Sequence, residues 1–166
     1  MDEAFTTFKA SKILDIKYGR LREWIDREYI PFLKRAEGAG DKTLFDRLHL
    51  CIIALFVYLL DRGMKREEAA ERVKGVDQYL RVTKIFDQPD MFDFIGIVNR
   101  PRVERKPSKS VLKLIKDISE RPGPTVRIIS HTEYTTKSLA ELAGGDFDDM
   151  VIVNFGKIRQ SVEERI

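Results

Sequence analysis

Residues 17–31 read KYGRLREWIDREYIP, and the rest of the N-terminal half is interpreted from this stretch. At 100° per residue, Leu21, Trp24 and Ile25 fall on one face of a helix. Pro31 is a stop signal because its ring and missing N–H break helical hydrogen bonding. The stretch therefore predicts an amphipathic helix over residues 17–30 that buries one apolar stripe.

The opposite side of this helix carries Gly19, Arg20, Arg22, Glu23 and Arg27. Guanidinium groups on the outer side of a short helix, with another short helix before it, are typical of a helix-turn-helix. Many surface helices also carry arginines that contact only water, so this pattern is not specific for DNA binding.

The composition limits the classes of protein to consider. The chain has 166 residues and a net charge of +3, so a nucleic-acid interface requires local clustering of cations. The single cysteine, Cys51, cannot form an internal disulfide, which fits a cytoplasmic location. The apolar run at residues 48–60 is too short to cross a bilayer, which takes about 20 residues, and predicts a central buried helix.

Signals on both sides of residues 17–31 predict further elements. A first helix is expected within residues 5–16, entered through Thr6 or Thr7. The expected inward residues of this helix are Phe8, Ala10, Ile13 and Leu14. Residues 32–43 combine Gly38 and Gly40 with three cations and predict a two-stranded wing. A central helix over residues 46–61, capped by Gly63, and a helix over residues 65–74 should follow.

The order helix, turn, helix, wing, long helix and short helix over residues 5–73 resembles the MerR superfamily of winged-helix DNA-binding domains. The matching residues are Leu21-Arg22-Glu23-Trp24, Tyr29-Ile30-Pro31, Asp46, Leu48 and residues 62–68, RGMKREE. The resemblance implies that Arg22 contacts phosphate, whereas the long dimerising helix of the family is not evident after residue 73. Glu23 stands where the family has an aromatic residue, and no cysteine stands where metal-sensing members hold their ligands.

The C-terminal half has a different pattern. It begins with a connector at residues 76–90. Three runs favour β-strands, at residues 92–98, 126–130 and 150–155, and they alternate with candidate helices at 108–120 and 135–143. A last helix is expected at residues 156–165. This alternation favours a small α/β domain with a three-stranded, mostly parallel sheet. The predicted fold class is α+β, with a winged helix-turn-helix at residues 1–75 and an α/β domain at residues 91–166 for dimerisation or effector sensing.

Residues 99–127 carry nine Lys or Arg against three Asp or Glu. Arg100, Arg102, Arg105 and Lys106 are candidate contacts for a ligand or phosphate at the end of a strand, although the pattern favours an exposed basic loop over such a site. His131 ends a strand without a recognisable catalytic partner. We therefore expect no enzymatic activity, no cofactor and no metal.

These observations favour a DNA-binding transcription regulator, dimeric on an inverted repeat, with residues 17–30 in the major groove and the wing on the backbone. The candidate DNA-binding residues are Lys17, Tyr18, Arg20, Arg22, Arg27, Lys34, Arg35 and Lys42. The alternative is a protein-interaction module on the same scaffold, because Glu23, Asp26 and Glu28 lie among the arginines. A third hypothesis places a small-molecule pocket near Arg100, Arg102 and His131.

Overall fold

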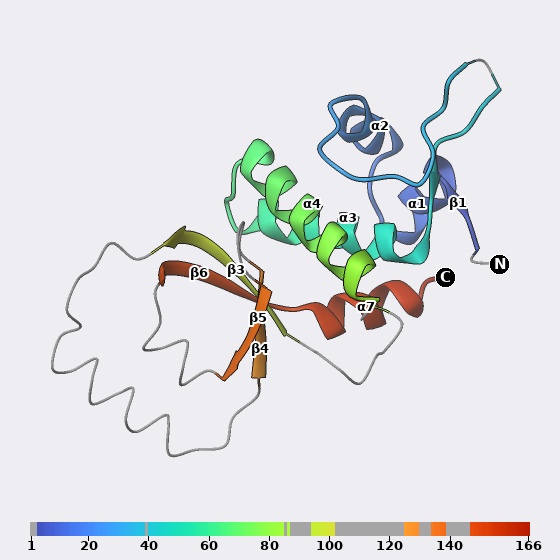
Figure 1. The fold of residues 1–166 in the computed structure, drawn as a ribbon. Helices are drawn as coiled ribbons and strands as arrows, with labels where there is room; N and C mark the ends of the chain where they lie inside the picture. The colour runs from blue at the N-terminus through green and yellow to red at the C-terminus, as the bar shows by residue number, and fades with distance from the viewer. Residues whose placement is uncertain are drawn as a thin grey trace, which may run out of the picture. The chain divides into compact units, whose positions relative to one another are not determined.

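The computed structural model describes residues 3–38, 40–84, 86, 94–101, 125–129, 134–138 and 147–166. Helices and strands are both present, so the predicted α+β class is confirmed (Figure 1). The chain divides into two compact units, which are described separately. The first comprises Met1–Gln88 together with Lys157–Ile166, and the second comprises Pro89–Gly156.

The first unit begins with β1 (Phe5–Thr6) and α1 (Thr7–Ile13). As predicted, Thr6 caps α1, because its hydroxyl accepts the Lys9 N–H at 3.3 Å. The buried side chains of α1 are Thr7, Ala10, Ser11 and Ile13. The prediction that Phe8 points inward is wrong, and its side chain is 59% exposed. With the helix entered at Thr7, the inner face follows positions i, i+3 and i+4 from that residue, and Phe8 lies beside it.

The second helix, α2 (Tyr18–Asp26), buries Leu21, Trp24 and Ile25, which confirms the apolar stripe. It ends before Pro31 because Glu28 adopts a left-handed conformation with φ of 55°. The Tyr29 N–H then donates back to the Trp24 carbonyl at 2.9 Å, which closes the helix end. The predicted helix end at residue 30 was therefore too late.

Residues 32–43 do not form the predicted two-stranded wing. Their one ladder contact is a bridge between Lys34 and Leu44, and β2 (Leu44–Phe45) pairs with β1 instead. Between them the chain forms a long loop that projects away from the helices (Figure 1). Asp41 organises this loop, since its carboxylate accepts the backbone N–H groups of Glu37 and Lys42 and binds the Lys34 ammonium group at 3.0 Å. Side-chain hydrogen bonds thus replace the expected strand pairing.

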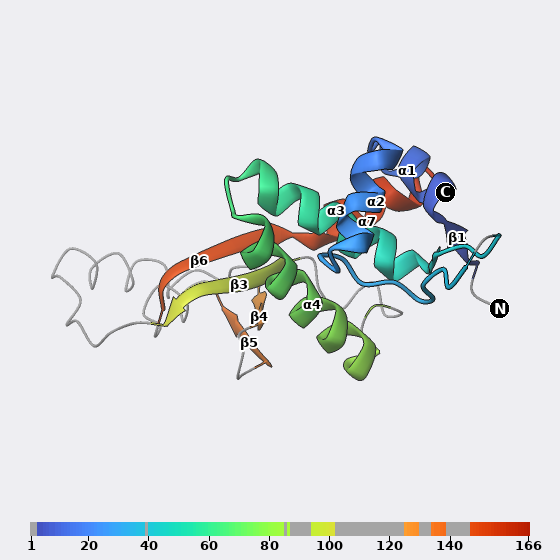
Figure 2. The same cartoon turned by 90° about the horizontal axis from the view of Figure 1, so that it is seen from above.

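The long helix α3 (Arg47–Asp61) starts and ends as predicted, with Asp46 as its N-cap and Gly63 at φ of 86° after its last turn. Its partner α4 (Arg66–Thr83) continues well beyond residue 74, into the expected connector. The continuing stripe of Val73, Val76 and Leu80 is buried and explains the extension. The two helices form a helical hairpin, seen from two directions in Figures 1 and 2.

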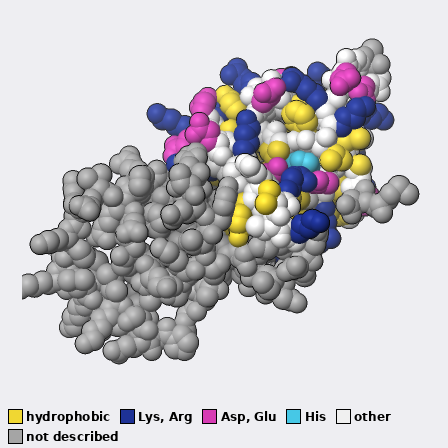
Figure 3. Space-filling model, in the orientation of Figure 1, with side chains coloured by type: hydrophobic (Ala, Val, Ile, Leu, Met, Phe, Trp, Pro, Cys, Tyr) yellow, Lys and Arg dark blue, Asp and Glu magenta, His cyan; other side chains and the backbone are white. Residues whose placement is uncertain are grey.

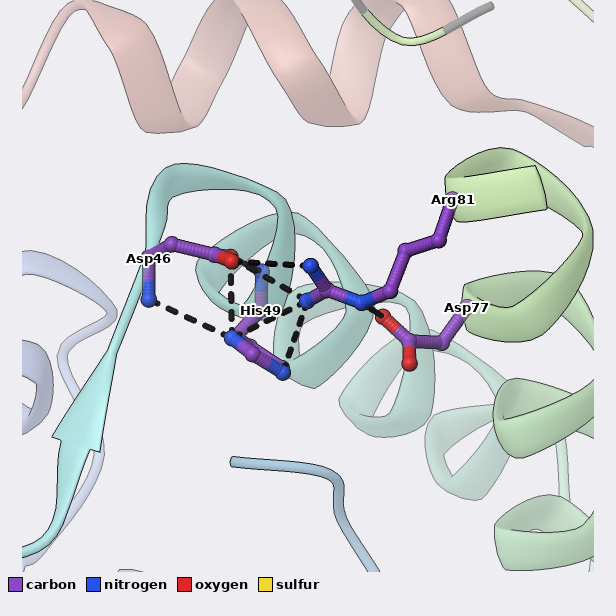
Figure 4. A network of polar contacts seen from close by, with 4 residues as sticks. All are labelled: Asp46, His49, Asp77 and Arg81. Carbon is purple, nitrogen blue, oxygen red and sulfur yellow. Dashed lines mark hydrogen bonds and ion pairs between the residues drawn. The ribbon is translucent and has the colours of Figure 1, made fainter. Parts of the chain in front are cut away.

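A polar network joins the start of α3 to the end of α4 (Figure 4). The Arg81 guanidinium donates to Asp46 at 2.9 Å and to Asp77 at 3.0 Å, and it lies 2.7 Å from Nε2 of His49. His49 is buried, and its backbone N–H donates to the Asp46 carboxylate at 2.8 Å. The network fixes α4 against the N-terminal end of α3.

The last helix, α7 (Phe155–Glu163), confirms the predicted C-terminal helix. Its residues from Lys157 onward belong to the first unit, where Glu163 pairs with Arg47 and Val162 is buried. Arg165 donates to the Ile13 carbonyl at 3.3 Å. The C-terminal end of the chain is therefore part of the helical unit.

The second unit contains a four-stranded sheet in the order β5-β4-β3-β6, made of β3 (Phe94–Pro101), β4 (Thr125–Ile129), β5 (Tyr134–Ser138) and β6 (Phe147–Asn154). Only β3 and β4 pair in parallel, so the prediction of a three-stranded, mostly parallel sheet is wrong. Only residues 130–133 separate β4 from β5, which is too short for a parallel crossover. β5 also replaces the start of the helix expected at residues 135–143.

The buried residues of this sheet include Ile95 on β3, which pairs with Val153 on β6. The helix expected at residues 108–120 and the rest of that expected at 135–143 lie outside the described residues. Within the described parts of the chain, no helix has the length and apolar character needed to cross a bilayer.

Candidate nucleic-acid interface

The position of α2 depends on contacts on its inner side. Trp24 is buried and packs edge-on against Phe56 of α3, with ring centroids 5.0 Å apart. Glu23 accepts from Arg66, the first residue of α4, at 3.2 Å, and Tyr29 donates to Glu67 at 2.8 Å. Glu23, which is an aromatic residue in the MerR-type domains that the sequence resembles, thus has a partner on another helix that was not predicted. These contacts hold α2 on the α3–α4 hairpin and leave its other side exposed.

The predicted DNA-binding cations divide into two groups. Three of them are already paired: Arg27 with Glu23 at 3.5 Å, Lys34 with Asp41 at 3.0 Å, and Arg35 with Glu28 at 3.0 Å. The pKa of Asp41 lies below its usual value. The hydrogen bond from the Lys34 ammonium group is the largest cause, and the backbone N–H groups of Glu37 and Lys42 add to it. These cations offer less charge to a phosphate than the sequence suggested.

The other group comprises Lys17, Arg20, Arg22 and Lys42, which form no ion pair within the described residues and are exposed. The Arg20 guanidinium lies 5.1 Å from the centroid of the Trp24 ring, so it has an aromatic partner although it has no carboxylate partner among the described residues. In Figure 3, Lys and Arg side chains are distributed over this helical unit with acidic side chains between them. The unpaired members of the predicted set therefore lie at the N-terminal end of α2 and in the 32–43 loop.

A groove of about 670 Å³ runs between α1, α2 and the 32–43 loop. Tyr18 and Arg22 line it from α2, and Lys42 lines it from the loop. The structure thus brings two of the unpaired predicted cations to one groove. Thr6, Thr7 and Thr43 add hydroxyl-bearing side chains to its lining, and Asp26, Glu37 and Asp41 add carboxylates.

Phe8 also lines this groove, and sequence analysis missed it because it was assigned to the core. Its ring contacts Tyr18 edge-on, with the ring centroids 6.5 Å apart. A signal was available in the sequence, since a helix entered through Thr6 places residues 7, 10 and 11 on the inner face and leaves Phe8 off it.

The structure describes little of the other predicted site residues. Arg100 belongs to β3, and the position of its side chain is not described. Arg102, Arg105, Lys106 and His131 lie outside the described residues. Among the residues that are described, no group of three or more His, Cys, Asp or Glu side chains could hold a metal ion.

A second hollow, of about 530 Å³, lies beside the polar network of Figure 4. Phe5, Leu48 and Leu80 form part of its wall, and Arg47 and Arg81 reach it already paired with carboxylates. The guanidinium groups of Arg47 and Arg81 therefore stabilise the packing of the helices.

Comparison with known proteins found no match, either among protein-family models or among curated proteins.

Proposed function

We propose that this protein is a DNA-binding transcription regulator that uses α2 as its recognition helix. The observation that carries the proposal is the excess of positive charge on α1, α2 and the turn between them, where, within the described part of the chain, Lys9 alone among the cations is paired with a carboxylate, that of Glu3. Residues 5–22 contain five Lys or Arg and one Asp, a local net charge of +4 in a chain whose total is +3. Lys17, Arg20 and Arg22 are exposed and engage no carboxylate within the described residues. Such a surface suits a polyanion such as DNA.

In this mechanism the N-terminal end of α2 enters the major groove and places Lys17, Tyr18 and Arg20 beside base edges. Arg22 and Lys42, from the two sides of the groove between α2 and the loop, contact backbone phosphates. Lys34, Arg35 and Arg27 contribute less, because each would first exchange a carboxylate partner for phosphate. Phosphate contacts set affinity and register, and contacts to base edges set sequence preference.

One such helix covers few base pairs, so a two-fold dimer on an inverted repeat is part of the proposal. The second unit, with its four-stranded sheet, is then available for dimerisation or for sensing an effector.

The alternative is a protein-interaction module, which rests on the carboxylates among the arginines. Two of these carboxylates are engaged within the chain, Glu23 by Arg66 and Glu28 by Arg35. Asp26 remains exposed on the groove. This internal pairing removes much of the mixed-charge character and favours the DNA proposal.

The first experiment selects fragments of sheared genomic DNA with the purified protein and sequences those retained. A regulator should recover a few sites that share an inverted repeat, with half-site centres about 10–10.5 bp or a multiple of this apart. Affinity for such a site should fall steeply between low and moderate salt because bound cations release counterions. Uniform or empty recovery would reject specific DNA binding and leave the protein-interaction module.

The role of Arg22 is tested by Arg22→Gln, with Lys74→Gln as the matched control. Lys74 is an exposed cation on α4 with no ion pair within the described residues. Loss of a phosphate contact should weaken binding to all sequences and reduce the slope of log affinity against log salt by about one. Lys74→Gln should change neither quantity. Equal behaviour of the two variants would remove Arg22 from the interface.

A further inference from the structure

Phe8 and Tyr18 form an exposed aromatic pair on the outer side of α1 and α2. Phe8 on α1 is 59% exposed, and Tyr18, the first residue of α2, is 45% exposed. Their rings meet edge-on at 62°, with centroids 6.5 Å apart, so the two side chains form one apolar surface built from both helices. The core does not require either ring, since the inner faces of α1 and α2 are filled by other residues.

Cations flank this pair along α1 and α2, and the same groove also carries Asp26, Glu37 and Asp41, of which Asp41 is paired with Lys34. The Lys12 ammonium group lies 4.5 Å from the centroid of the Phe8 ring, Lys17 precedes Tyr18, and Arg22 follows it by one turn on the same side of α2. An apolar protein partner would bury these charges and lose their hydration. A nucleic acid offers phosphates to the cations and apolar base surfaces to the rings. The charge of the surroundings therefore favours DNA as the partner of the pair.

The major groove of DNA has one characteristic apolar feature, the C5-methyl group of thymine. Because α2 begins at Tyr18, the pair stands at the end of the helix that the proposed mechanism inserts into this groove. We propose that Phe8 and Tyr18 recognise thymine methyl groups and so give the protein a preference for thymine at defined positions of its site. This inference rests on the proposed function and specifies what its recognition helix reads.

The expected effect can be scaled from burial of one methyl group. Removing a buried methyl from water is worth about 0.8 kcal/mol, which corresponds to about a fourfold change in affinity. Replacing thymine by deoxyuridine removes this methyl and leaves the hydrogen-bonding groups of the base pair in place. This base substitution therefore tests the contact without altering the direct hydrogen-bond readout.

The experiment measures the affinity of the full-length protein for its selected site, with each thymine replaced in turn by deoxyuridine. The wild type should lose about fourfold at one or two positions of each half-site. Phe8→Ala and Tyr18→Ala should bind the thymine and deoxyuridine sites equally at the position that each ring contacts. Both side chains are exposed, so neither variant should unfold the protein, and circular dichroism checks this.

Val82→Ala serves as the control, because Val82 is an exposed apolar residue at the end of α4. It should retain the full thymine preference of the wild type. Equal binding of the wild type to all substituted sites would overturn the inference while leaving DNA binding intact. Thymine preference that persists in both aromatic variants would also overturn it. Failure of the wild type to bind any DNA would reject the proposed function itself, and the inference with it.

Discussion

Asp46 engages three groups at the junction of α3 and α4. Its carboxylate caps α3 through the His49 N–H, lies 2.8 Å from the His49 ring nitrogen Nδ1 and binds the Arg81 guanidinium (Figure 4). Burial by itself raises the pKa of Asp46, but the hydrogen bonds with His49 and Arg81 outweigh it and hold the pKa well below its usual value. The charged form of Asp46 is therefore the one that the fold stabilises.

We expect Asp46→Asn to lower the free energy of unfolding at pH 7 by about 2 kcal/mol, because charged hydrogen bonds to Arg81 are lost. A carboxylate with a depressed pKa contributes stability above its unfolded pKa of about 3.9, and this contribution is lost as the pH falls. The difference between wild type and variant should thus shrink below about pH 4. Urea unfolding at a series of pH values measures it.

Asp61→Asn is the control for this experiment, since Asp61 is an exposed residue at the end of α3. Its effect should stay within about 0.5 kcal/mol at every pH. A difference for Asp46→Asn that is constant down to pH 3 would show that the charge of Asp46 does not support the network.

At the scale of elements, α2 contains a glycine that its packing does not require. A Cβ atom added at Gly19 would meet nothing within 4 Å, and the same holds for Gly75 inside α4. Neither glycine has a positive φ. Glycine costs a helix roughly 0.5–1 kcal/mol relative to alanine, so both positions give up stability. At Gly19, on the exposed N-terminal turn of α2, the missing side chain permits close approach of a partner.

Gly19→Ala and Gly75→Ala form a matched pair of variants. Both should raise the free energy of unfolding, by up to about 1 kcal/mol, with the smaller gain at Gly19 because it lies at the helix end. If α2 approaches DNA through its N-terminal turn, only Gly19→Ala should also weaken binding. Thermal unfolding and DNA affinity, measured on both variants, test this. Unchanged affinity for Gly19→Ala would argue against close approach at that turn.

At the scale of the whole molecule, the helical unit is closed by the C-terminal end of the chain. Cys51 on α3 is fully buried, and burial, followed by the charge of Glu163, raises the pKa of its thiol to about 12. A buried, protonated thiol is inert, because the thiolate is the reactive form. Glu163 of α7 pairs with Arg47, which lies one helical turn before Cys51 on α3, so α7 contacts this part of α3.

A chain that ends at Gly156 should therefore expose Cys51. We expect the full-length protein to react slowly with a thiol reagent at pH 8 and the truncated chain to react many times faster, as the pKa returns toward its usual value of about 8.5. Glu163→Gln in the full-length chain should keep the thiol protected, because the buried side chain of Val162 still holds α7 in place. Equal, slow reaction of the truncated chain would show that α7 does not cover Cys51.

The extent of successful prediction differs between elements for physical reasons. Caps such as Thr6 and Gly63 act within one helical turn, so they could be recognised from neighbouring residues. The apolar stripe of α2 was predicted for the same reason. The strand β5 was missed because its residues were assigned to a helix at 135–143. The antiparallel pairing of β6 with β3 was missed because strand order depends on contacts between distant segments.

For the candidate site, the sequence identified the cations but not their partners. The exposure of Lys17, Arg20 and Arg22 could be predicted because it follows from helical periodicity, which depends only on the local sequence. Whether a cation is free or paired depends on which carboxylate the fold brings near it, as Arg66 meets Glu23 from another helix and Asp41 meets Lys34 across a loop. The contact between the rings of Phe8 and Tyr18 likewise required tertiary structure, because it arises where two helices meet.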